Sequence, residues 1–172
     1  RYINSNLTGG SDVLGASTKP GQSAAADLSL YYVSNKFDIS DRPSDITFGM
    51  NISNIGAKMA YTDNADRDFI PTNLRMGTAL NMELDEYNEF SFSFDANKLL
   101  VPTQPVYQQA NGAVVFGVDN LPIIYSGRDP NVGVASGIFG SFTDAPGNVT
   151  IDENGNTIGV EKGSKFIEEL NE

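Results

Sequence analysis

The stretch that decides the fold is Glu89-Phe90-Ser91-Phe92-Ser93-Phe94-Asp95-Ala96. Phenylalanine occupies every second position, and small polar or acidic residues occupy the positions between. Side chains alternate across a β-strand with a period of two, so one face of this strand is apolar and the other is polar. The pattern predicts an amphipathic strand over about 89–99. The architecture then depends on what covers each face of this strand.

The same alternation recurs upstream and predicts an antiparallel sheet. Apolar and polar residues alternate over about 25–34, 45–54 and 72–84, in addition to 89–99. The segment Asp85-Glu86-Tyr87-Asn88 is a tight turn that joins the last two strands into a hairpin with matching apolar faces. Residues 38–45 are predicted to be a turn, and residues 1–23 a loop rich in Gly, Ser and Asn.

The character of the chain changes after Leu99, where Pro and Gly become frequent and long strands are no longer predicted. Small hairpins are expected around Asn111-Gly112 and Asn154-Gly155, because Asn-Gly favours a two-residue turn. Ser164–Leu170 has the pattern of a helix start. We therefore predict a loop over 1–23, four strands over 24–99 and a long, extracellular loop region over 100–172, all within one domain.

Composition excludes several functions. The 172 residues contain no Cys, His or Trp, and the net charge is -11. An acidic chain without a basic cluster does not bind a nucleic-acid backbone. Without His, the usual partner of a nucleophilic serine and the commonest metal ligand are missing. No catalytic, cofactor-binding or metal-binding residues are predicted.

Two architectures place different material against the apolar faces. In a soluble sandwich they meet a second sheet, whereas in an outer-membrane barrel they meet lipid. The strands exceed the usual sandwich length of about 5–6 residues, and short and long connections alternate along the chain. Both features favour a transmembrane barrel. Four strands cannot close one, since the smallest barrels have about eight, so the barrel is expected to be incomplete in this chain.

The barrel interpretation assigns each face of the 72–99 hairpin. The residues expected to face lipid are apolar: Leu74, Met76, Leu80, Phe90, Phe92 and Phe94. The residues expected to face the lumen are charged: Arg75, Glu83, Glu89 and Asp95. Arg75 and Asp95 are positioned to pair across the hairpin.

Four segments carry a family resemblance: Asn54–Tyr61, Phe69–Gly77, Asp95–Thr103 and Gly137–Gly147. These strings resemble the PorV family of outer-membrane proteins, which belong to the type IX secretion system of Bacteroidota and are related to FadL-type barrels. The last string normally runs soon into a helix of the Glu168-Glu169-Leu170 type, whereas here about 20 residues intervene. The resemblance covers most of residues 24–172, the middle to late part of a family member.

The resemblance implies a FadL-like barrel in the outer membrane that acts as a non-enzymatic adaptor and carries no cofactor. Its implied partners are the type IX translocon channel, the C-terminal signal domains of secreted cargo, a sortase-like attachment complex and the lipid bilayer. The alternatives are a FadL-like transporter of hydrophobic solutes and a soluble all-β binding module.

The first functional candidates are three apolar residues in a Gly-rich loop, Ile138, Phe139 and Phe142. They either fold back over the barrel mouth or bind a partner. Two acidic loops contain possible Ca²⁺ ligands, Asp63, Asp66 and Asp68 in one and Asp152, Asn154 and Asn156 in the other. Neither has the spacing of a calcium loop, and we interpret both as solvated loops.

Overall fold

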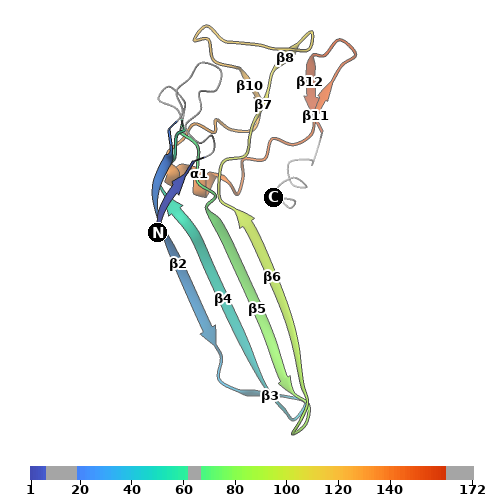
Figure 1. Ribbon diagram of the computed structural model, residues 1–172. Helices are drawn as coiled ribbons and strands as arrows, with labels where there is room; N and C mark the ends of the chain where they lie inside the picture. The colour runs from blue at the N-terminus through green and yellow to red at the C-terminus, as the bar shows by residue number, and fades with distance from the viewer. Residues whose placement is uncertain (7–18, 62–66, 162–172) are drawn as a thin grey trace. The chain divides into compact units, whose positions relative to one another are not determined.

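The computed structural model describes residues 1–6, 19–61 and 67–161. The chain divides into two compact units, Arg1–Leu99 and Leu100–Glu172 (Figure 1). Most of the regular structure is antiparallel β, which confirms the predicted all-β class.

The first unit is built on one antiparallel sheet. Its members are β1 (Tyr2–Ser5), β2 (Gly21–Val33), β3 (Phe37–Ile39), β4 (Arg42–Gly56), β5 (Asn73–Glu83) and β6 (Glu89–Leu99). Their order is β1-β2-β4-β5-β6, with β3 also paired to β4. The long strands β2, β4, β5 and β6 lie side by side in Figure 1 in the order of the sequence, as expected for a meander.

The register of β5 and β6 confirms the hairpin predicted from the alternation. Phe92 lies opposite Leu80, and Phe90 lies opposite Met82. The Asp85 carboxylate closes the turn by accepting hydrogen bonds from the backbone N–H groups of Tyr87, at 2.9 Å, and Asn88, at 3.0 Å. These bonds hold the pKa of Asp85 below its ordinary value, the Tyr87 N–H having the largest effect.

The structure differs from the sequence prediction near both ends of the first long strands. Residues 1–23, predicted to be a loop, include β1 and the start of β2 at Gly21. Part of the turn predicted over 38–45 is instead a small hairpin, in which β3 pairs with the start of β4. Ser40 and Asp41 form its two-residue turn, and both have positive φ angles, 51° and 59°, as a type I′ turn requires.

The first unit has a small buried cluster at one end of the sheet. Ala25, Met59 and Ile70 are buried together, and Ile3 and Tyr61 pack against them. Met59 is held by a pair of backbone hydrogen bonds with Asp68, each 2.8 Å long. This cluster fixes the segment after β4 against the first residues of β2.

Over residues 100–161, the second unit contains short elements only. They are β7 (Val106–Tyr107), β8 (Gln109–Ala110), β9 (Ala113–Val114), β10 (Ile124–Ser126), α1 (Val134–Gly140), β11 (Val149–Ile151) and β12 (Thr157–Val160). They pair two by two, β7 with β10, β8 with β9 and β11 with β12. The β8–β9 and β11–β12 hairpins turn at Asn111-Gly112 and Asn154-Gly155, as the sequence predicts.

The two Asn-Gly turns contact each other. The Gly112 N–H donates to the carbonyl oxygen of Gly155 at 3.1 Å. The Asn111 N–H donates to Oδ1 of Asn156 at 2.9 Å. A Cβ added at Gly155 would lie 2.5 Å from the Gly112 nitrogen. The close approach of the two hairpin tips therefore requires glycine at this position.

One element of the second unit was predicted wrongly. The segment from Gly137 to Phe142 was expected to be a loop, but Gly137–Gly140 form the end of α1. The helix has Gly133 as its N-cap, without a side-chain cap hydrogen bond, so its start lacks the Ser, Thr, Asp or Asn that usually marks a helix N-terminus. The helix start predicted at Ser164–Leu170 lies outside the described residues.

Candidate functional site

The four charged residues predicted to face a lumen share one face of the sheet. Arg75 and Glu83 lie at alternating positions of β5, while Glu89 and Asp95 lie on β6. The register places Glu83 opposite Glu89 and Gly77 opposite Asp95. Cross-strand partners share a face of the sheet, so the charges line one surface, which we call the polar face.

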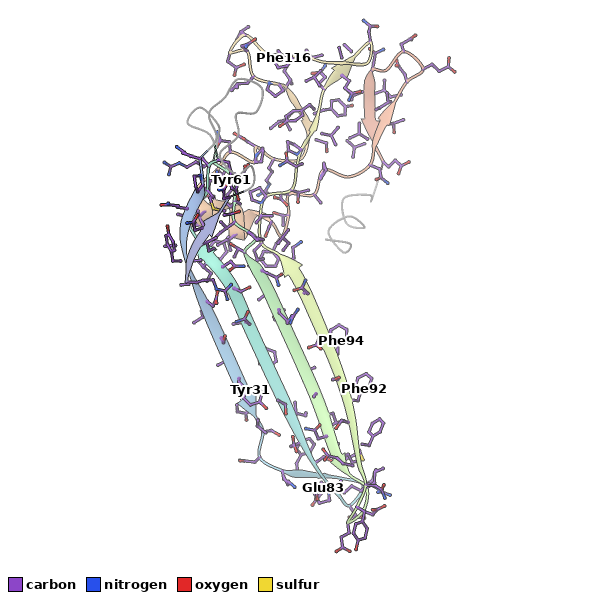
Figure 2. All side chains as sticks on the ribbon, viewed as in Figure 1. Tyr31, Tyr61, Glu83, Phe92, Phe94 and Phe116 are labelled. Atoms are coloured by element: carbon purple, nitrogen blue, oxygen red, sulfur yellow. The ribbon has the colours of Figure 1, made fainter. Side chains whose placement is uncertain are left out.

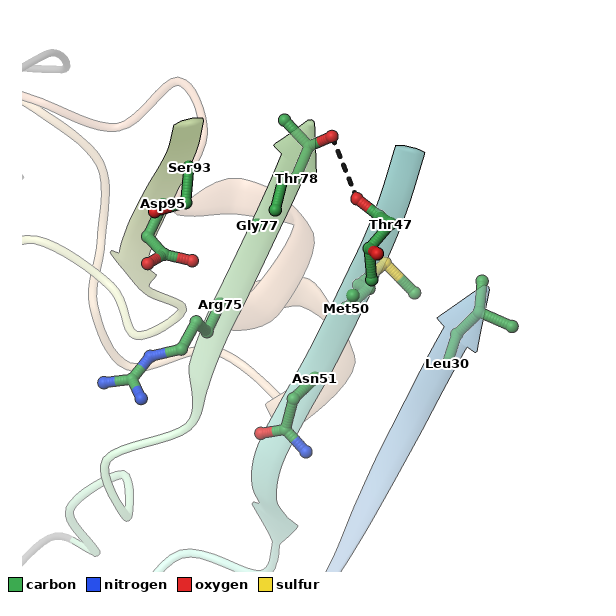
Figure 3. Close-up of a pocket in the computed structure, with 11 residues that line it drawn as sticks. Leu30, Thr47, Met50, Asn51, Arg75, Gly77, Thr78, Ser93 and Asp95 are labelled. Atoms are coloured by element: carbon green, nitrogen blue, oxygen red, sulfur yellow. Dashed lines mark hydrogen bonds between the residues drawn. The ribbon is translucent and has the colours of Figure 1, made fainter. Parts of the chain in front are cut away.

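A hollow of about 330 Å³ lies in the polar face, over the middle of β4, β5 and β6, and it extends to Leu30 of β2. Gly49 of β4 pairs directly with Gly77 of β5, and neither has a side chain to fill the space. Figure 3 shows Arg75, Asn51 and Asp95 around this hollow. A Cβ added at Gly77 would lie 2.2 Å from Oδ1 of Asp95, whereas a Cβ at Gly49 would meet nothing within 4 Å.

Arg75 and Asp95 do not form the pair that the sequence suggests. Within the described residues no ion pair joins them, and the register sets Arg75 opposite Asn97. Both residues line the hollow instead (Figure 3). The hollow is therefore bordered by one basic and one acidic residue.

Amide and hydroxyl groups connect the strands along the rest of the polar face. Nδ2 of Asn81 donates to Oδ1 of Asp45 at 2.9 Å, and Oγ of Ser91 donates to Oδ1 of Asn81 at 2.9 Å. Nδ2 of Asn51 donates to Oγ of Ser29 at 2.7 Å. These bonds cross from β2 to β4 and from β4 through β5 to β6, so the face is a hydrogen-bonded polar surface.

At the far end of the polar face, two carboxylates stand opposite each other. Glu83 and Glu89 are direct cross-strand partners, and like charges in this arrangement repel. Lys36 forms an ion pair with Glu83. Its hydrogen bond to Glu83 raises the pKa of Lys36 above the ordinary lysine value. The lysine thereby offsets the repulsion at this edge.

The opposite face is apolar, and the described residues of the first unit leave it uncovered. The six residues predicted to face lipid lie on it: Leu74, Met76, Leu80, Phe90, Phe92 and Phe94. Phe92 and Phe94 are 63% and 62% exposed. Figure 2 shows both rings projecting away from β6.

The apolar face continues across the whole width of the long strands. Met50 of β4 pairs with Leu30 of β2 and with Met76 of β5. Leu28 and Leu30 are 58% and 53% exposed. Contiguous apolar surface on this scale marks a contact with a membrane or a protein. No helix among the described residues has the length and hydropathy needed to cross a membrane.

The three predicted partner-binding residues lie on and just after α1. Phe139 is 77% exposed, Phe142 is partly exposed, and Ile138 is half-buried. Oγ of Ser141 donates to the carbonyl oxygen of Ile138 at 2.8 Å and closes the end of the helix. The Phe139 ring is therefore presented outward on a short, ordered element.

A second exposed apolar group was missed by the sequence analysis. Phe116, Val118 and Leu121 are all strongly exposed around a tight turn in the second unit. The Gly117 N–H donates to the carbonyl oxygen of Leu121 at 2.8 Å, and Asn120 has a positive φ of 59°. The sequence feature that could have identified this group is the set of single apolar residues around Gly117 and Asn120. The sequence-based prediction for this region is limited to a hairpin around Asn111-Gly112.

The structure describes one of the two acidic loops with possible Ca²⁺ ligands in full and the other only in part. Asp63 and Asp66 lie outside the described residues, and Asp68 is exposed beside its backbone bridge to Met59. The Asp152 carboxylate accepts hydrogen bonds from the backbone N–H groups of Asn154 and Asn156, at 2.9 and 2.8 Å. Its bonds to Asn156 lower the pKa of Asp152. This carboxylate closes the β11–β12 turn.

The first unit thus defines a class: an antiparallel meander of long strands, with one polar face and one exposed apolar face. A family model described as type IX secretion system protein PorV matches residues 1–106. That match spans more than half of the chain, and the chain belongs to the PorV family. A search of curated proteins found no match. Membership identifies the chain as a component of type IX secretion.

Proposed function

We propose that this chain forms part of an outer-membrane β-barrel that acts as an adaptor in type IX secretion. In this role it takes cargo that carries a C-terminal signal domain from the translocon channel and passes it to the sortase-like attachment complex. The observation that carries the proposal is the exposed apolar face across β2, β4, β5 and β6.

The dimensions of the sheet suit a bilayer. β5 and β6 have 11 residues each. At about 3.4 Å per residue and a tilt of about 45°, such a strand rises about 26 Å, close to the apolar band of about 25 Å around outer-membrane barrels. Lipid would cover Leu74, Phe92 and their neighbours, while Arg75 and Asp95 would face the lumen.

The two alternatives have less support. A soluble module needs a second layer over the apolar face, and the described part of the second unit has only strands of two to four residues. A transporter of hydrophobic solutes needs an apolar lumen, whereas the polar face here carries amides, hydroxyls and charges. A lipid-embedded barrel with a polar lumen therefore accounts for both faces.

The exposed Phe139 ring is the proposed contact with the translocon or cargo. An exposed aromatic side chain that enters a partner's pocket typically contributes more than about 1 kcal/mol to binding. Ile138 and Phe142 would complete the contact. The second unit would then be the extracellular part that selects partners.

One experiment tests localisation and adaptor role together. The full-length protein is expected in the outer-membrane fraction, with a gel mobility that changes on heating. Phe139→Asp should keep both properties but reduce co-purification of translocon and cargo. The control is Ile158→Asp, at a 59% exposed apolar residue of β12. A soluble protein without a mobility shift would refute the barrel, and unchanged co-purification of Phe139→Asp would refute the contact.

A further inference from the structure

A second hollow in the first unit has a different character from the one in the polar face. It measures about 410 Å³ and lies beside the start of β2, within the size range of small-molecule sites. The described residues that line it are Lys19, Pro20, Gln22, Lys58, Ala60 and Arg67. Three of these six are cationic and none is acidic.

Hydrogen bonds to backbone carbonyl groups bring three segments together around this hollow. The Lys19 N–H donates to the carbonyl oxygen of Tyr61 at 2.8 Å, and Oγ of Ser23 donates to the carbonyl oxygen of Ala57 at 2.6 Å. On the other side, Met59 and Asp68 exchange two backbone hydrogen bonds of 2.8 Å. The segments that carry the three cations are therefore extended neighbours.

Alternation along these segments separates the cations from the apolar cluster. Met59 is buried with Ala25 and Ile70, so Lys58 and Ala60 point to the opposite face. Asp68 is the bridge partner of Met59 and shares its face, which leaves Arg67 on the face of Lys58. The same geometry that buries Met59 gathers positive charge in the hollow.

An aromatic ring fixes one of the cations. Nζ of Lys58 lies 4.3 Å from the centroid of the Phe69 ring, within the range of a cation–π contact. Phe69 is two residues from Arg67, so both belong to the same face of the extended segment. This contact limits the freedom of the Lys58 side chain, which lines the hollow.

The charge of the hollow contrasts with that of the whole chain. The chain has 11 basic residues and a net charge of -11, yet three of the basic residues line this one hollow. Lysine supplies point charges and arginine a planar donor fork, and together they suit phosphate oxygens. We propose that the hollow beside β2 binds a phosphate group, either free or carried by a phosphomonoester such as a lipid headgroup.

The proposal is tested by titrating the full-length protein, in non-ionic detergent, with inorganic phosphate in a calorimeter. Lys58→Gln combined with Arg67→Gln should weaken binding about tenfold or more, because hydrogen bonds to charged groups are strong. Lys58→Arg combined with Arg67→Lys keeps both charges and should retain most of the affinity. Added NaCl should weaken binding by wild type, since the site is solvent-accessible.

The matched control is Lys36→Gln, which removes one positive charge at the far end of the sheet. It should leave phosphate affinity within about twofold, because screening limits charge effects over that separation. All variants are first checked for unchanged circular dichroism and heat-dependent gel mobility. If the double glutamine variant does not fold, Lys19→Gln alone tests the same site from a separate segment.

Mixed micelles with and without phosphatidic acid distinguish the two sources of phosphate. Binding to phosphatidic acid that exceeds binding to inorganic phosphate, and that the double variant loses, assigns the site to a lipid headgroup. Equal binding of both assigns it to phosphate itself. The proposal is overturned if wild type shows no saturable binding to either probe up to about 10 mM, a free energy of less than about 3 kcal/mol. It is also overturned if the double variant binds like wild type, or if Lys36→Gln loses as much affinity.

Discussion

Replacing Gly56 by alanine should destabilise the sheet far more than the same replacement at Gly49, although both residues belong to β4. A Cβ at Gly56 would lie 2.4 Å from the carbonyl oxygen of Ala24 and 2.9 Å from Cα of Ala25. It would also lie 2.7 Å from Cδ1 of Ile70. Two of these atoms belong to the backbone of β2 and cannot rotate away.

The magnitude follows from comparing the two variants. Gly→Ala stabilises by about 0.4–1 kcal/mol through the unfolded chain, and this gain is common to both sites. Gly49→Ala meets no atom within 4 Å and keeps the gain. Gly56→Ala adds an overpacking cost of about 1–3 kcal/mol. The two free energies of unfolding should therefore differ by about 1–3 kcal/mol, a factor of about 5–150 in the folding equilibrium.

Gly77→Ala provides an intermediate case. Its new Cβ would lie 2.2 Å from Oδ1 of Asp95, the end of a side chain that can change rotamer. The cost should be about 0.5–1.5 kcal/mol, the price of an unfavourable side-chain conformation. The expected order of stability is Gly49→Ala, then Gly77→Ala, then Gly56→Ala.

The assay is urea unfolding of the full-length protein in detergent, followed by circular dichroism and by the folded band on an unheated gel. Midpoints are compared at equal m-values, so that a shift reports stability. Equal stability of Gly56→Ala and Gly49→Ala, within about 0.5 kcal/mol, would refute the close packing of β4 against β2. So would a larger loss for Gly49→Ala.

Three further predictions follow from other parts of the molecule. Phe92→Arg should lower the free energy of unfolding in vesicles by about 2–4 kcal/mol if lipid covers this face near the bilayer midplane. Ser93→Arg, on the polar face, should change it by no more than about 0.5 kcal/mol. Equal losses of stability for the two variants in urea unfolding would contradict the assignment of faces. The turn closed by Asp85 should be intact above the ordinary aspartate pKa of about 3.9 and should open as the pH falls through the lowered pKa of the folded state. The reason is that the turn's hydrogen bonds stabilise the ionised carboxylate. Amide exchange in the turn should follow this pH dependence in wild type and lose it in Asp85→Asn. Asp144 is buried and accepts two hydrogen bonds of 2.9 Å from Thr103. Asp144→Ala should therefore destabilise the second unit by about 1–3 kcal/mol, seen as faster proteolysis between residues 100 and 161. Unchanged cleavage would show that the Asp144–Thr103 hydrogen bonds do not stabilise this unit.

The long strands could be predicted because their patterns are strict. The segment predicted over 89–99 coincides with β6, and the one over 72–84 contains β5. An eleven-residue alternation leaves little freedom, because a slip by one residue would move every side chain to the other face. Which residues share a face was therefore determined by the sequence alone.

The elements that the sequence does not predict depend on backbone geometry that the residue types do not indicate. The Ser40-Asp41 turn has two positive φ angles without the usual Asn-Gly, so the sequence pattern predicts a turn where most of β3 lies. Helix α1 contains Gly137 and ends at Gly140, and glycine lowers helix propensity by about 1 kcal/mol. The cation-lined hollow is not evident from the sequence because Lys19 is distant from Lys58 and Arg67 along the chain, and their segments come together through backbone hydrogen bonds.

The contact between the two hairpin tips of the second unit also bears on the deamidation of asparagine in these turns. In an Asn-Gly pair, the glycine nitrogen attacks the asparagine side chain, ammonia leaves, and water opens the resulting ring to aspartate or isoaspartate. Here the Gly112 N–H donates to Gly155, and the Gly155 N–H donates to the carbonyl oxygen of Asp152 at 3.0 Å. The Gly112 nitrogen is engaged while the two tips remain together, whereas the Gly155 nitrogen is engaged while the β11–β12 turn itself stays closed. Deamidation at Asn111 would therefore record separation of the tips, and deamidation at Asn154 would record opening of the β11–β12 turn.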